Sequence, residues 1–577
     1  MAWLTKWEPE NLQFWRETGS GIAWRTLILT TFSLVASFAT WFVMSAVVVR
    51  MPGLGFKFDT MQLFWLAAMP GLAGGTLRLI HAFLIPIYGT RMTVTTSTFL
   101  KLIPMVWLGF AIQDTTTSFA MFMVIAFLCG MGGGDFSSYM PSTSLFFPRR
   151  LQGTAMGIQA GIGNFGVSLV QFVTPWIIGF AALGAVVGGP QAFNTATIVK
   201  DVVVTKTNGV VTDVVFKKPE LAAAVVVSKG EAGVVSNIAK QDGDAGKNLK
   251  LEVKKDDKGA VTDVRLSILV RKELYLQNAA FWYVPYLLIA GILCWIFLRS
   301  VPVKASFGDQ LDIMKNKHTW FCVITYIMTF GSFSGFSAAF PIMIKTIYGV
   351  FDGAPDPLTY AYIGPLVGSL IRAAGGPLSD RYGGSVWTQF SGLGLIAGCL
   401  FLIFGGYLTP TSVDQFNGFL WGMLWIFLMS GIGNFATFRQ YPIIFAHSPR
   451  QGAQVLGWTG AWAAYGPFVF ASLIGASITN SGSAATFFWG AIVFYVVASV
   501  INWVYYTKPG AVRGDWGTGK TWWDRISEAE REQIRAKACI GPCSTLSSPS
   551  AASCTVRCWC RLSCFATGSP RRSGSMP

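Results

Sequence analysis

The chain has 577 residues, of which 52% are hydrophobic and only 12% are charged. A soluble domain carries about 25% charged residues, so this composition excludes an ordinary soluble protein and predicts membrane-spanning helices. The formal net charge of +16 does not indicate nucleic-acid binding, because the basic residues lie mainly in short loops and tails, where they orient a membrane protein.

Residues 1–24 form a polar and aromatic lead that suits a membrane interface. Twelve apolar segments follow, and about 20 residues are enough to cross a bilayer. They are residues 25–48, 60–88, 95–113, 117–145, 153–187, 276–298, 319–347, 358–378, 388–408, 416–440, 451–477 and 485–506. We therefore predict an all-α polytopic membrane protein with twelve spans.

The spans fall into two groups of six. The expected divisions are an N-terminal half at 25–189, an insert at 190–275, span six at 276–298, a linker between the halves at 299–318, a C-terminal half at 319–506 and a tail at 507–577.

Lysine and arginine alternate between successive loops. The basic loops contain Arg91, Arg149, Arg150, Arg299, Lys304, Lys315, Lys317, Arg381 and Arg450. The intervening loops are nearly free of these residues, so the positive-inside rule places the basic loops and both termini in the cytoplasm. We expect a multi-pass protein of the cytoplasmic (inner) membrane, in contact with the lipid bilayer.

The insert at 190–275 is too charged to cross a membrane. Strands at Thr197–Thr205 and Val210–Phe216 are predicted to form a hairpin, because Asn208-Gly209 between them fits a tight primed turn. Strands at Lys250–Lys254 and Ala260–Val270 predict a second hairpin. The expectation is a small β-rich extracytoplasmic cap without a transport role, and a role in partner binding or assembly is the alternative.

The tail carries a candidate amphipathic helix at 522–537, and its composition changes after residue 538. Six cysteines follow: Cys539, Cys543, Cys554, Cys558, Cys560 and Cys564. Their Cys-x-x-x-Cys spacing gives weak support to metal binding, and the favoured expectation is a disordered tail. The three histidines do not cluster, and no nucleotide motif is present. We therefore expect no metal, nucleotide or other cofactor.

The two halves repeat each other. Gly130–Gly166 and Gly431–Gly466 are glycine-rich stretches that share a Gly-Asp/Asn-Phe element and a Pro-Arg turn, about 300 residues apart. Weak internal symmetry of this kind is typical of two-halved transporters.

Small residues in such stretches allow helices to approach closely in lipid. The glycines that we predict to pack or gate helices are Gly133, Gly134, Gly161, Gly163, Gly166, Gly431 and Gly433.

Arg78 and Arg372 lie inside apolar segments at matching places of the two halves, each ten residues before a Tyr-Gly pair. A guanidinium in hydrocarbon costs about 2.5–3.5 kcal/mol, so each must face the protein interior and find acceptors. No glutamate lies in the spans, and the planar fork of arginine matches a planar oxyanion. These two residues predict an anion site, and structural arginines bonded to carbonyls are the alternative.

Other polar and aromatic residues could serve that site. Asp135 is either held by neighbouring glycine and serine backbone groups or is a proton-coupling group. Tyr326 and Phe330 share a helical face, and with Phe136 they could sandwich a flat anion. Asn164 could donate to it, although aromatic residues at helical spacing more often serve packing.

Several motifs of the sequence resemble those of known transporters. Gly376–Gly384 is similar to the G-x-x-x-D-R-x-G loop of the major facilitator superfamily. The two glycine-rich stretches resemble the paired nitrate signatures of the nitrate/nitrite porter family within that superfamily, as do Gly75–Arg78 and Thr329–Ser337. The resemblance covers about residues 20–510 outside the insert.

The resemblance implies nitrate and nitrite as substrates and alternating access by two rocking halves with sliding glycine surfaces. It assigns the anion grip to Arg78 and Arg372, the aromatic clamp to Phe136, Tyr326 and Phe330, and the signature amide to Asn164. Asp135 departs from it, since relatives often have asparagine there.

The favoured expectation is nitrate/nitrite antiport. Proton-coupled nitrate symport is the first alternative, a transporter-like sensor is a remote one, and no catalytic constellation indicates an enzyme.

Overall fold

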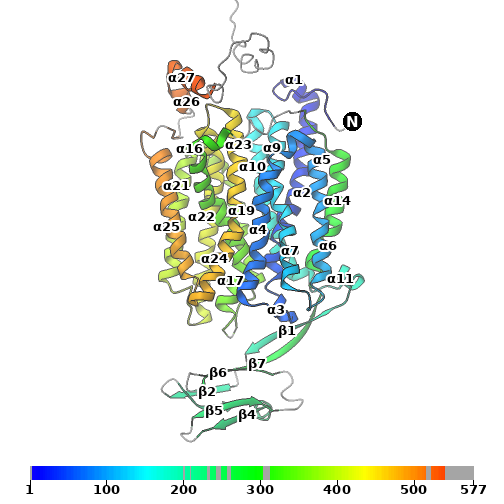
Figure 1. The fold of residues 1–577 in the computed structure, drawn as a ribbon, viewed down its shortest axis with the longest axis vertical. Coiled ribbons are helices and arrows are strands. Elements are labelled where there is room, and N and C mark those ends of the chain that lie inside the picture. The colour runs from blue at the N-terminus through cyan, green and yellow to red at the C-terminus, as the bar shows by residue number, and fades with distance from the viewer. Residues whose placement is uncertain are drawn as a thin grey trace, which may run out of the picture. The chain divides into compact units, whose positions relative to one another are not determined.

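The computed structural model is mostly helical, with a small group of strands (Figure 1). It describes residues 3–198, 202–207, 210–230, 234–241, 249–255, 261–302, 312–351, 353–511, 513–514 and 522–539. The chain divides into two units, Met1–Trp522 and Trp523–Pro577.

The helices of the N-terminal half coincide with the first six apolar segments and the residues that flank them. They are α1 Leu12–Phe14, α2 Ser20–Val47, α3 Met51–Leu54, α4 Thr60–His81, α5 Leu84–Leu100, α6 Leu102–Ala111, α7 Phe119–Cys129, α8 Met131–Gly134, α9 Phe136–Phe146, α10 Arg149–Ile177, α11 Ala182–Val186, α13 Asn278–Phe281 and α14 Tyr283–Phe297. The π-helical turn η1, Trp15–Gly19, joins α1 to α2.

The C-terminal half repeats this arrangement. Its helices are α16 Lys317–Tyr326, η4 Ile327–Gly331, α17 Ser332–Met343, η5 Ile344–Tyr348, α18 Pro357–Ala361, α19 Ile363–Ala374, α20 Gly376–Tyr382, α21 Gly384–Phe404, α22 Phe416–Ile444, α23 Pro449–Ala463, α24 Gly466–Ser481, α25 Ala485–Asn502 and η7 Trp503–Thr507. The short 3-10 turns η3 Asp312–Lys315 and η6 Val413–Gln415 precede α16 and α22.

Eleven helices within the described residues are long and apolar enough to cross a membrane, against the twelve predicted. The expected eighth span contains α18 and α19, and neither is long enough alone. Tyr362 between them has φ −66° and ψ −24°, so the helical path continues from Pro357 to Ala374. The predicted polytopic helical fold is confirmed, with this span assembled from two pieces. The predicted fifth span was too long, because α10 ends at Ile177.

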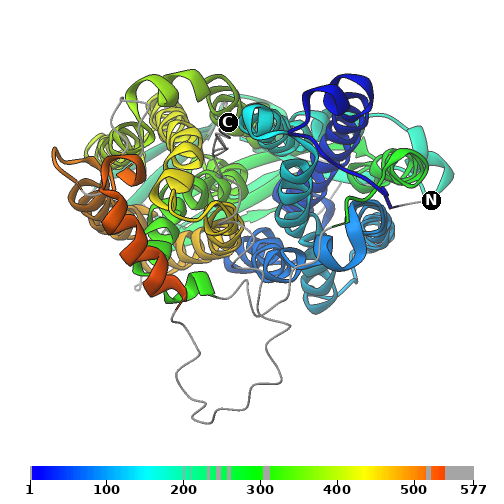
Figure 2. The ribbon, with the colours of Figure 1, turned by 90° about the horizontal axis from the view of Figure 1, so that it is seen from above.

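The two halves form two neighbouring groups of helices, which Figure 2 shows from above. Within a half, α10 packs on α2 and α21 packs on α22. The halves meet where α10 contacts α19 and where α4 contacts α24.

The internal repeat is visible in the turns that follow the two arginine helices. Gly89 has φ +75° and Gly383 has φ +94°, a backbone region that favours glycine. The matched Tyr-Gly pairs of the sequence therefore mark equivalent turns.

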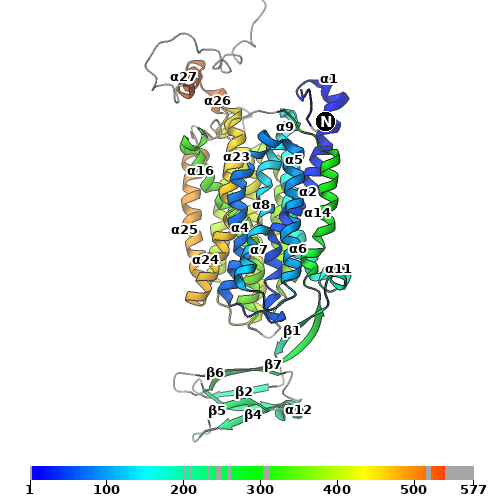
Figure 3. The same ribbon diagram turned by 45° about the vertical axis from the view of Figure 1, so that its right-hand side comes forward.

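The insert folds into three small antiparallel sheets (Figure 3). Its strands are β1 Gln191–Ile198, β2 Val202–Thr207, β3 Val210–Phe216, β4 Val225–Lys229, β5 Val235–Lys240, β6 Leu249–Lys255 and β7 Val261–Leu274, with the short helix α12 at Pro219–Ala222. The pairs β2–β3 and β6–β7 are the two predicted hairpins. Their predicted turns at 208–209 and 256–259 lie outside the described residues.

One predicted strand was wrong. Thr197–Thr205 is divided between β1, which pairs with β7 from Gln191 to Ile198, and β2, which pairs with β3. Pairing with β7 joins positions 69 to 83 residues apart, and no local pattern reveals it. The hairpin β4–β5 was not predicted.

The insert has its own small hydrophobic core and is attached to the helices through β1. The core includes Val211, Val235 and Leu266, all nearly inaccessible to solvent. Gln191 Nε2 donates to Ile112 O at 2.9 Å.

Residues 522–539 form α26, Trp522–Arg525, and α27, Glu528–Cys539, which confirms the predicted tail helix in two pieces. A capping box starts α27: Glu530 N donates to Ser527 Oγ at 3.3 Å, and Ser527 N donates to Glu530 Oε2 at 2.9 Å. The remaining tail cysteines, from Cys543 onward, lie outside the described residues.

Candidate anion site

Arg78 lies in the last turn of α4. The helix begins with a capping box, in which Gln62 N donates to Asp59 Oδ1 at 2.7 Å and Asp59 N donates to Gln62 Oε1 at 3.1 Å. Arg78 is fully buried, and its Nε donates to Gly133 O at 2.7 Å. Its Nη1 donates to Gly460 O of the other half at 2.6 Å, while Nη2 has no hydrogen-bond partner in the described part of the chain.

Arg372 occupies the matching place on α19. The residue is 6% exposed, and its Nη2 donates to Tyr326 Oη at 3.4 Å. Its Nη1 has no partner within the described residues. Each half therefore presents one buried guanidinium with a free N–H donor. A buried donor without a partner costs free energy of folding.

Three predicted aromatic residues gather between the two arginines. The Phe136 and Phe330 rings lie 6.5 Å apart at 22°, and Tyr326 stacks on Phe330 at 5.4 Å and 10°. Arg78 lies 4.9 Å from the Phe136 centroid and 5.2 Å from that of Phe330, and Arg372 lies 5.6 Å from the latter. These cation–π contacts hold both guanidinium groups against one ring stack.

Two further aromatic residues belong to this cluster and were missed from the sequence. Trp41 lies 5.2 Å below the Arg78 guanidinium, and its Nε1 donates to Pro70 O at 2.9 Å. Phe438 lies 4.8 Å from Arg372. Phe438 follows Phe435 by one helical turn, and Phe435 is the residue that the repeat matches to Phe136.

Asn164 on α10 is fully buried. Its Oδ1 and Nδ2 have no hydrogen-bond partner among the residues described. Within the described part of the chain, Asn164 is therefore not hydrogen-bonded to either arginine. Asn434 in α22 is equally buried and equally without described partners.

Asp135 is fully buried at the junction of α8 and α9, and the alternative in which backbone groups hold its carboxylate is wrong. Ser37 Oγ donates to its Oδ2 at 2.5 Å, and Ser97 Oγ donates to its Oδ1. Lys101 Nζ forms an ion pair with Oδ2, and His81 Nδ1 lies 3.7 Å from Oδ1. Lys101 lies within a predicted span, and this unusual position was the signal that could have revealed it.

The predicted glycines lie at close helix contacts. A Cβ at Gly166 would lie 2.2 Å from Val35 O, and one at Gly433 would lie 2.2 Å from Thr329 Cγ2. One at Gly161 would lie 2.9 Å from Ala373 Cβ, in the opposite half. A Cβ at Gly133, Gly134, Gly163 or Gly431 would also lie within 3.0 Å of a neighbour. The glycines therefore lie where helices approach closely, and their role in packing or gating stays a prediction.

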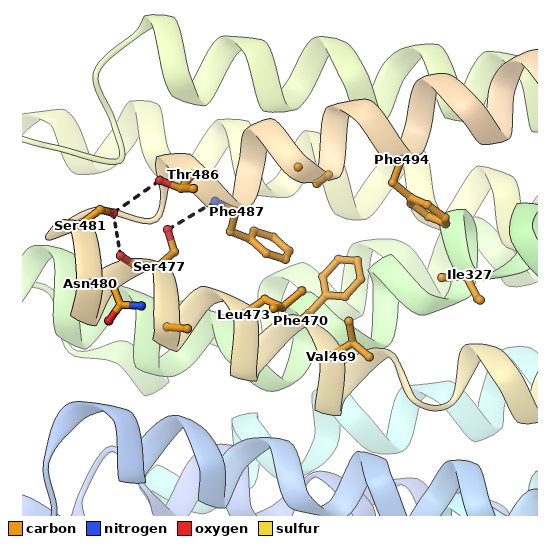
Figure 4. Close-up of a pocket in the computed structure, with 13 residues that line it drawn as sticks. Ile327, Val469, Phe470, Leu473, Ser477, Asn480, Ser481, Thr486, Phe487 and Phe494 are labelled. Carbon is orange, nitrogen blue, oxygen red and sulfur yellow. Dashed lines mark hydrogen bonds between the residues drawn. The ribbon is translucent and has the colours of Figure 1, made fainter.

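A groove of about 560 Å³ between α24 and α25 lies apart from this cluster (Figure 4). Its walls carry the rings of Phe470, Phe487 and Phe494, and its polar groups, such as Ser481 and Thr486, gather at one end. It shares no lining residue with the arginine cluster.

The arginine cluster is suited to an anion. Neither arginine forms an ion pair with a carboxylate in the described part of the chain. The two positive charges are buried in aromatic surroundings of low polarity, where charges interact more strongly than in water. A small planar anion would meet free N–H donors from both halves and apolar ring faces.

Two groups of membrane-spanning helices with a charged site between them define a secondary transporter of the major facilitator type. A crystal structure of a bacterial homologue of the human lysosomal transporter Spinster, in an inward-facing and occupied conformation, supports this fold. It matches with a TM-score of 0.52 and 13% identity over 82% of this chain and 95% of that one.

The chain belongs to the nitrate/nitrite transporter family. It is 48% identical over 510 residues to the probable nitrate/nitrite antiporter NarK2 of Thermus thermophilus, covering 88% of this chain and 98% of that protein. It is 32% identical to the nitrate/nitrite transporter NarU of Escherichia coli, covering 88% and 96%. No protein-family model matches the chain.

Proposed function

We propose that this protein exchanges nitrate for nitrite across the cytoplasmic membrane by alternating access. Membership of the nitrate/nitrite transporter family supports the substrates. The observation that carries the proposal is the pair of buried arginines, one from each half, with free N–H donors against a shared phenyl ring.

The ring spacing suits a flat substrate. Phe136 and Phe330 are 6.5 Å apart, close to two van der Waals contacts of about 3.5 Å each. A planar monoanion between the rings would reach Arg78 Nη2 and Arg372 Nη1. The planar shape of the anion and the arginine fork then select nitrate or nitrite over bulkier or tetrahedral anions.

Charge gives a reason for exchange. Without an anion, closing the halves brings two like charges together in surroundings of low dielectric, which is unfavourable. A bound anion removes that repulsion, so the occupied protein crosses between the two orientations and the empty one does not. The carrier returns only with a second anion, which is antiport.

We also propose that both termini and the loops with Arg91 and Arg381 face the cytoplasm of an inner membrane, because these loops are basic. The insert at 190–275 then faces outward, and the linker at 299–318 lies inside. The role proposed for Asn164 is donation of its free amide to the anion when the halves move.

Proton-coupled symport is the second candidate, and the buried carboxylate of Asp135 beside His81 favours it. The ion pair with Lys101 counts against it, because an ammonium and two hydroxyl donors stabilise the ionised form of the carboxylate and disfavour its protonation.

Direct binding tests the proposed site. Nitrate and nitrite should each bind the purified protein in detergent and compete with each other, while sulfate should not compete. Binding should be lost when Arg78 and Arg372 are both changed to glutamine. Binding that survives this double change would show that the anion site lies elsewhere.

A further inference from the structure

The ion pair between Lys101 and Asp135 lies against the anion site, and its lysine has no assigned role. Lys101 caps the C-terminus of α5 and is fully buried. Its Nζ donates to Ser97 O at 3.0 Å and to Asp135 Oδ2. A buried ammonium inside a span is costly, so its position calls for a reason.

The carboxylate of Asp135 is surrounded by polar side chains from three other helices. Ser37 belongs to α2, His81 to α4, and Ser97 to α5. The titratable and charged groups that face it among the described residues are Lys101 at the end of α5, His81 and Arg78 on α4, and Tyr139 on α9. Arg78 lies one turn before His81 on α4.

Asp135 shares its short backbone segment with two parts of the site. Gly133 O accepts from Arg78 Nε at 2.7 Å, and the Phe136 ring lies 4.9 Å from the Arg78 guanidinium. An unneutralised carboxylate here would attract the Arg78 guanidinium and repel an anion next to it.

The second half shows what the same positions contain without charge. The repeat matches Asp135 to Asn434. Twelve residues after the matched glycines Gly89 and Gly383 lie Lys101 and Leu395. The charges thus occur together in one half and are absent together from the other, so each half has no net charge at this pair of positions.

We propose that Lys101 is a positioning residue, which neutralises Asp135 so that the site keeps the two positive charges that bind the anion. This inference rests on the proposed function. The pair also fixes the segment from Gly133 to Phe136 that carries an acceptor of Arg78 and one ring of the clamp. Lys101 acts through Asp135 and does not touch the substrate.

The test is a double-mutant cycle in the full-length protein, with nitrate as the probe. Nitrate/nitrite exchange in proteoliposomes gives the half-saturating nitrate concentration, and a nitrate-dependent rise in Tm in detergent reports binding. Lys101→Met should raise the half-saturating concentration about tenfold or more. Lys101→Met/Asp135→Asn should return to within about threefold of wild type, because the unpaired carboxylate is gone.

A pH series separates this role from simple packing. In Lys101→Met the carboxyl is either ionised, which repels nitrate, or protonated, which does not. Nitrate affinity of this variant should therefore fall as the pH rises and the carboxyl loses its proton. The wild type and the double variant should show no such fall.

Two more variants keep the test decisive. Lys101→Gln retains a hydrogen-bond donor but not the charge, so it should lose nitrate affinity as Lys101→Met does. It serves as the test if Lys101→Met fails to fold. Leu395→Met at the matched position is the control and should be unaffected. If the wild type exchanges nitrate, either of two results would overturn the inference. One is an unchanged nitrate affinity in both Lys101 variants, and the other is a double variant that is as impaired as Lys101→Met. A wild type that neither binds nor exchanges nitrate would overturn the proposed function itself.

Discussion

The guanidinium groups of Arg78 and Arg372 both lie over the ring of Phe330, 5.2 Å and 5.6 Å from its centroid. The arginines come from different halves of the chain, so the ring lies where the halves meet. An anion bound here would touch both halves at once. It would link the movement of one half to that of the other.

Replacing either arginine by lysine should impair transport although the charge is kept. Lysine presents a point charge in place of a planar fork, so Arg78→Lys loses the bonds to Gly133 O and Gly460 O. We expect the half-saturating nitrate concentration to rise about tenfold or more in Arg78→Lys and Arg372→Lys. Arg299→Lys, at a partly buried position just beyond the end of α14, is the matched control. Equal kinetics in all three variants would count against the site.

The aromatic residues of the stack should contribute unequally to nitrate binding. Phe136→Leu and Phe330→Leu remove flat faces that contact the guanidinium groups, and should weaken nitrate binding by about 1–2 kcal/mol. Tyr326→Phe keeps the stack and removes only the oxygen that accepts from Arg372 at 3.4 Å, so its effect should be smaller. Calorimetric titration with nitrate measures the series. A larger loss in Tyr326→Phe than in Phe330→Leu would contradict this order.

Close helix contacts make specific glycines sensitive to one added methyl group. Gly166→Ala would place its Cβ 2.2 Å from Val35 O, between α10 and α2. We expect a stability loss of about 1–3 kcal/mol, seen as a lower Tm in detergent and slower exchange. Gly157 on the same helix has no atom within 4 Å of such a Cβ, so Gly157→Ala should leave Tm unchanged. A similar Tm for both variants would disprove the packing role.

An ion pair joins the two halves near the attachment of the insert. Arg50 Nη2 bonds Asp356 Oδ2 at 2.6 Å, and Lys345 Nζ donates to Val49 O. Asp356→Asn removes the charge but keeps the cap on Leu358 N. For a partly exposed ion pair the expected loss of interaction free energy is about 0.2–1 kcal/mol. This loss should favour separation of the two halves at the end where the insert is attached.

Spin labels at the exposed positions Lys57 and Val350 would report this opening as a longer distance distribution. Asp263→Asn, which removes the exposed pair with Lys206 at 2.9 Å in the insert, is the control. An unchanged distribution in Asp356→Asn would mean that the pair does not hold the halves together.

Most of the insert should be dispensable for transport. Ile198 of β1 faces Ser267 of β7 directly, so an Asn-Gly turn can replace residues 199–266 and leave a short hairpin. This deletion removes the separate hydrophobic core but keeps Phe193, whose ring packs against Gly53 and lies 5.7 Å from Arg50. Exchange should stay within about twofold of wild type in proteoliposomes. A collapse of exchange in a correctly folded deletion variant would assign the insert a transport role.

The sequence predicted those parts of the site that carry a strong local signal. Arg78 and Arg372 are conspicuous because a guanidinium is rare in an apolar segment and both occupy matching places. Lys101 was missed although it lies in a predicted span, because its partner Asp135 is 34 residues away on another helix. The pairing of β1 with β7 was missed for the same reason.

The repeat does not identify the ring that lies beside Arg372. It matches Phe136 to Phe435, but the Phe435 ring lies near Gly375 and Trp387, while Phe438 contacts Arg372. The halves are therefore not exact copies around the anion. Side-chain packing decides which ring turns inward, and one helical turn is enough to change it.

The most direct test of exchange is nitrate uptake by proteoliposomes that contain the purified protein. Vesicles are loaded with nitrite or left without it, and each set is measured with and without an acidic exterior. We expect uptake that requires internal nitrite and does not respond to the pH gradient. Uptake into nitrite-free vesicles that is driven by an acidic exterior and lost in Asp135→Asn would contradict it and establish proton symport.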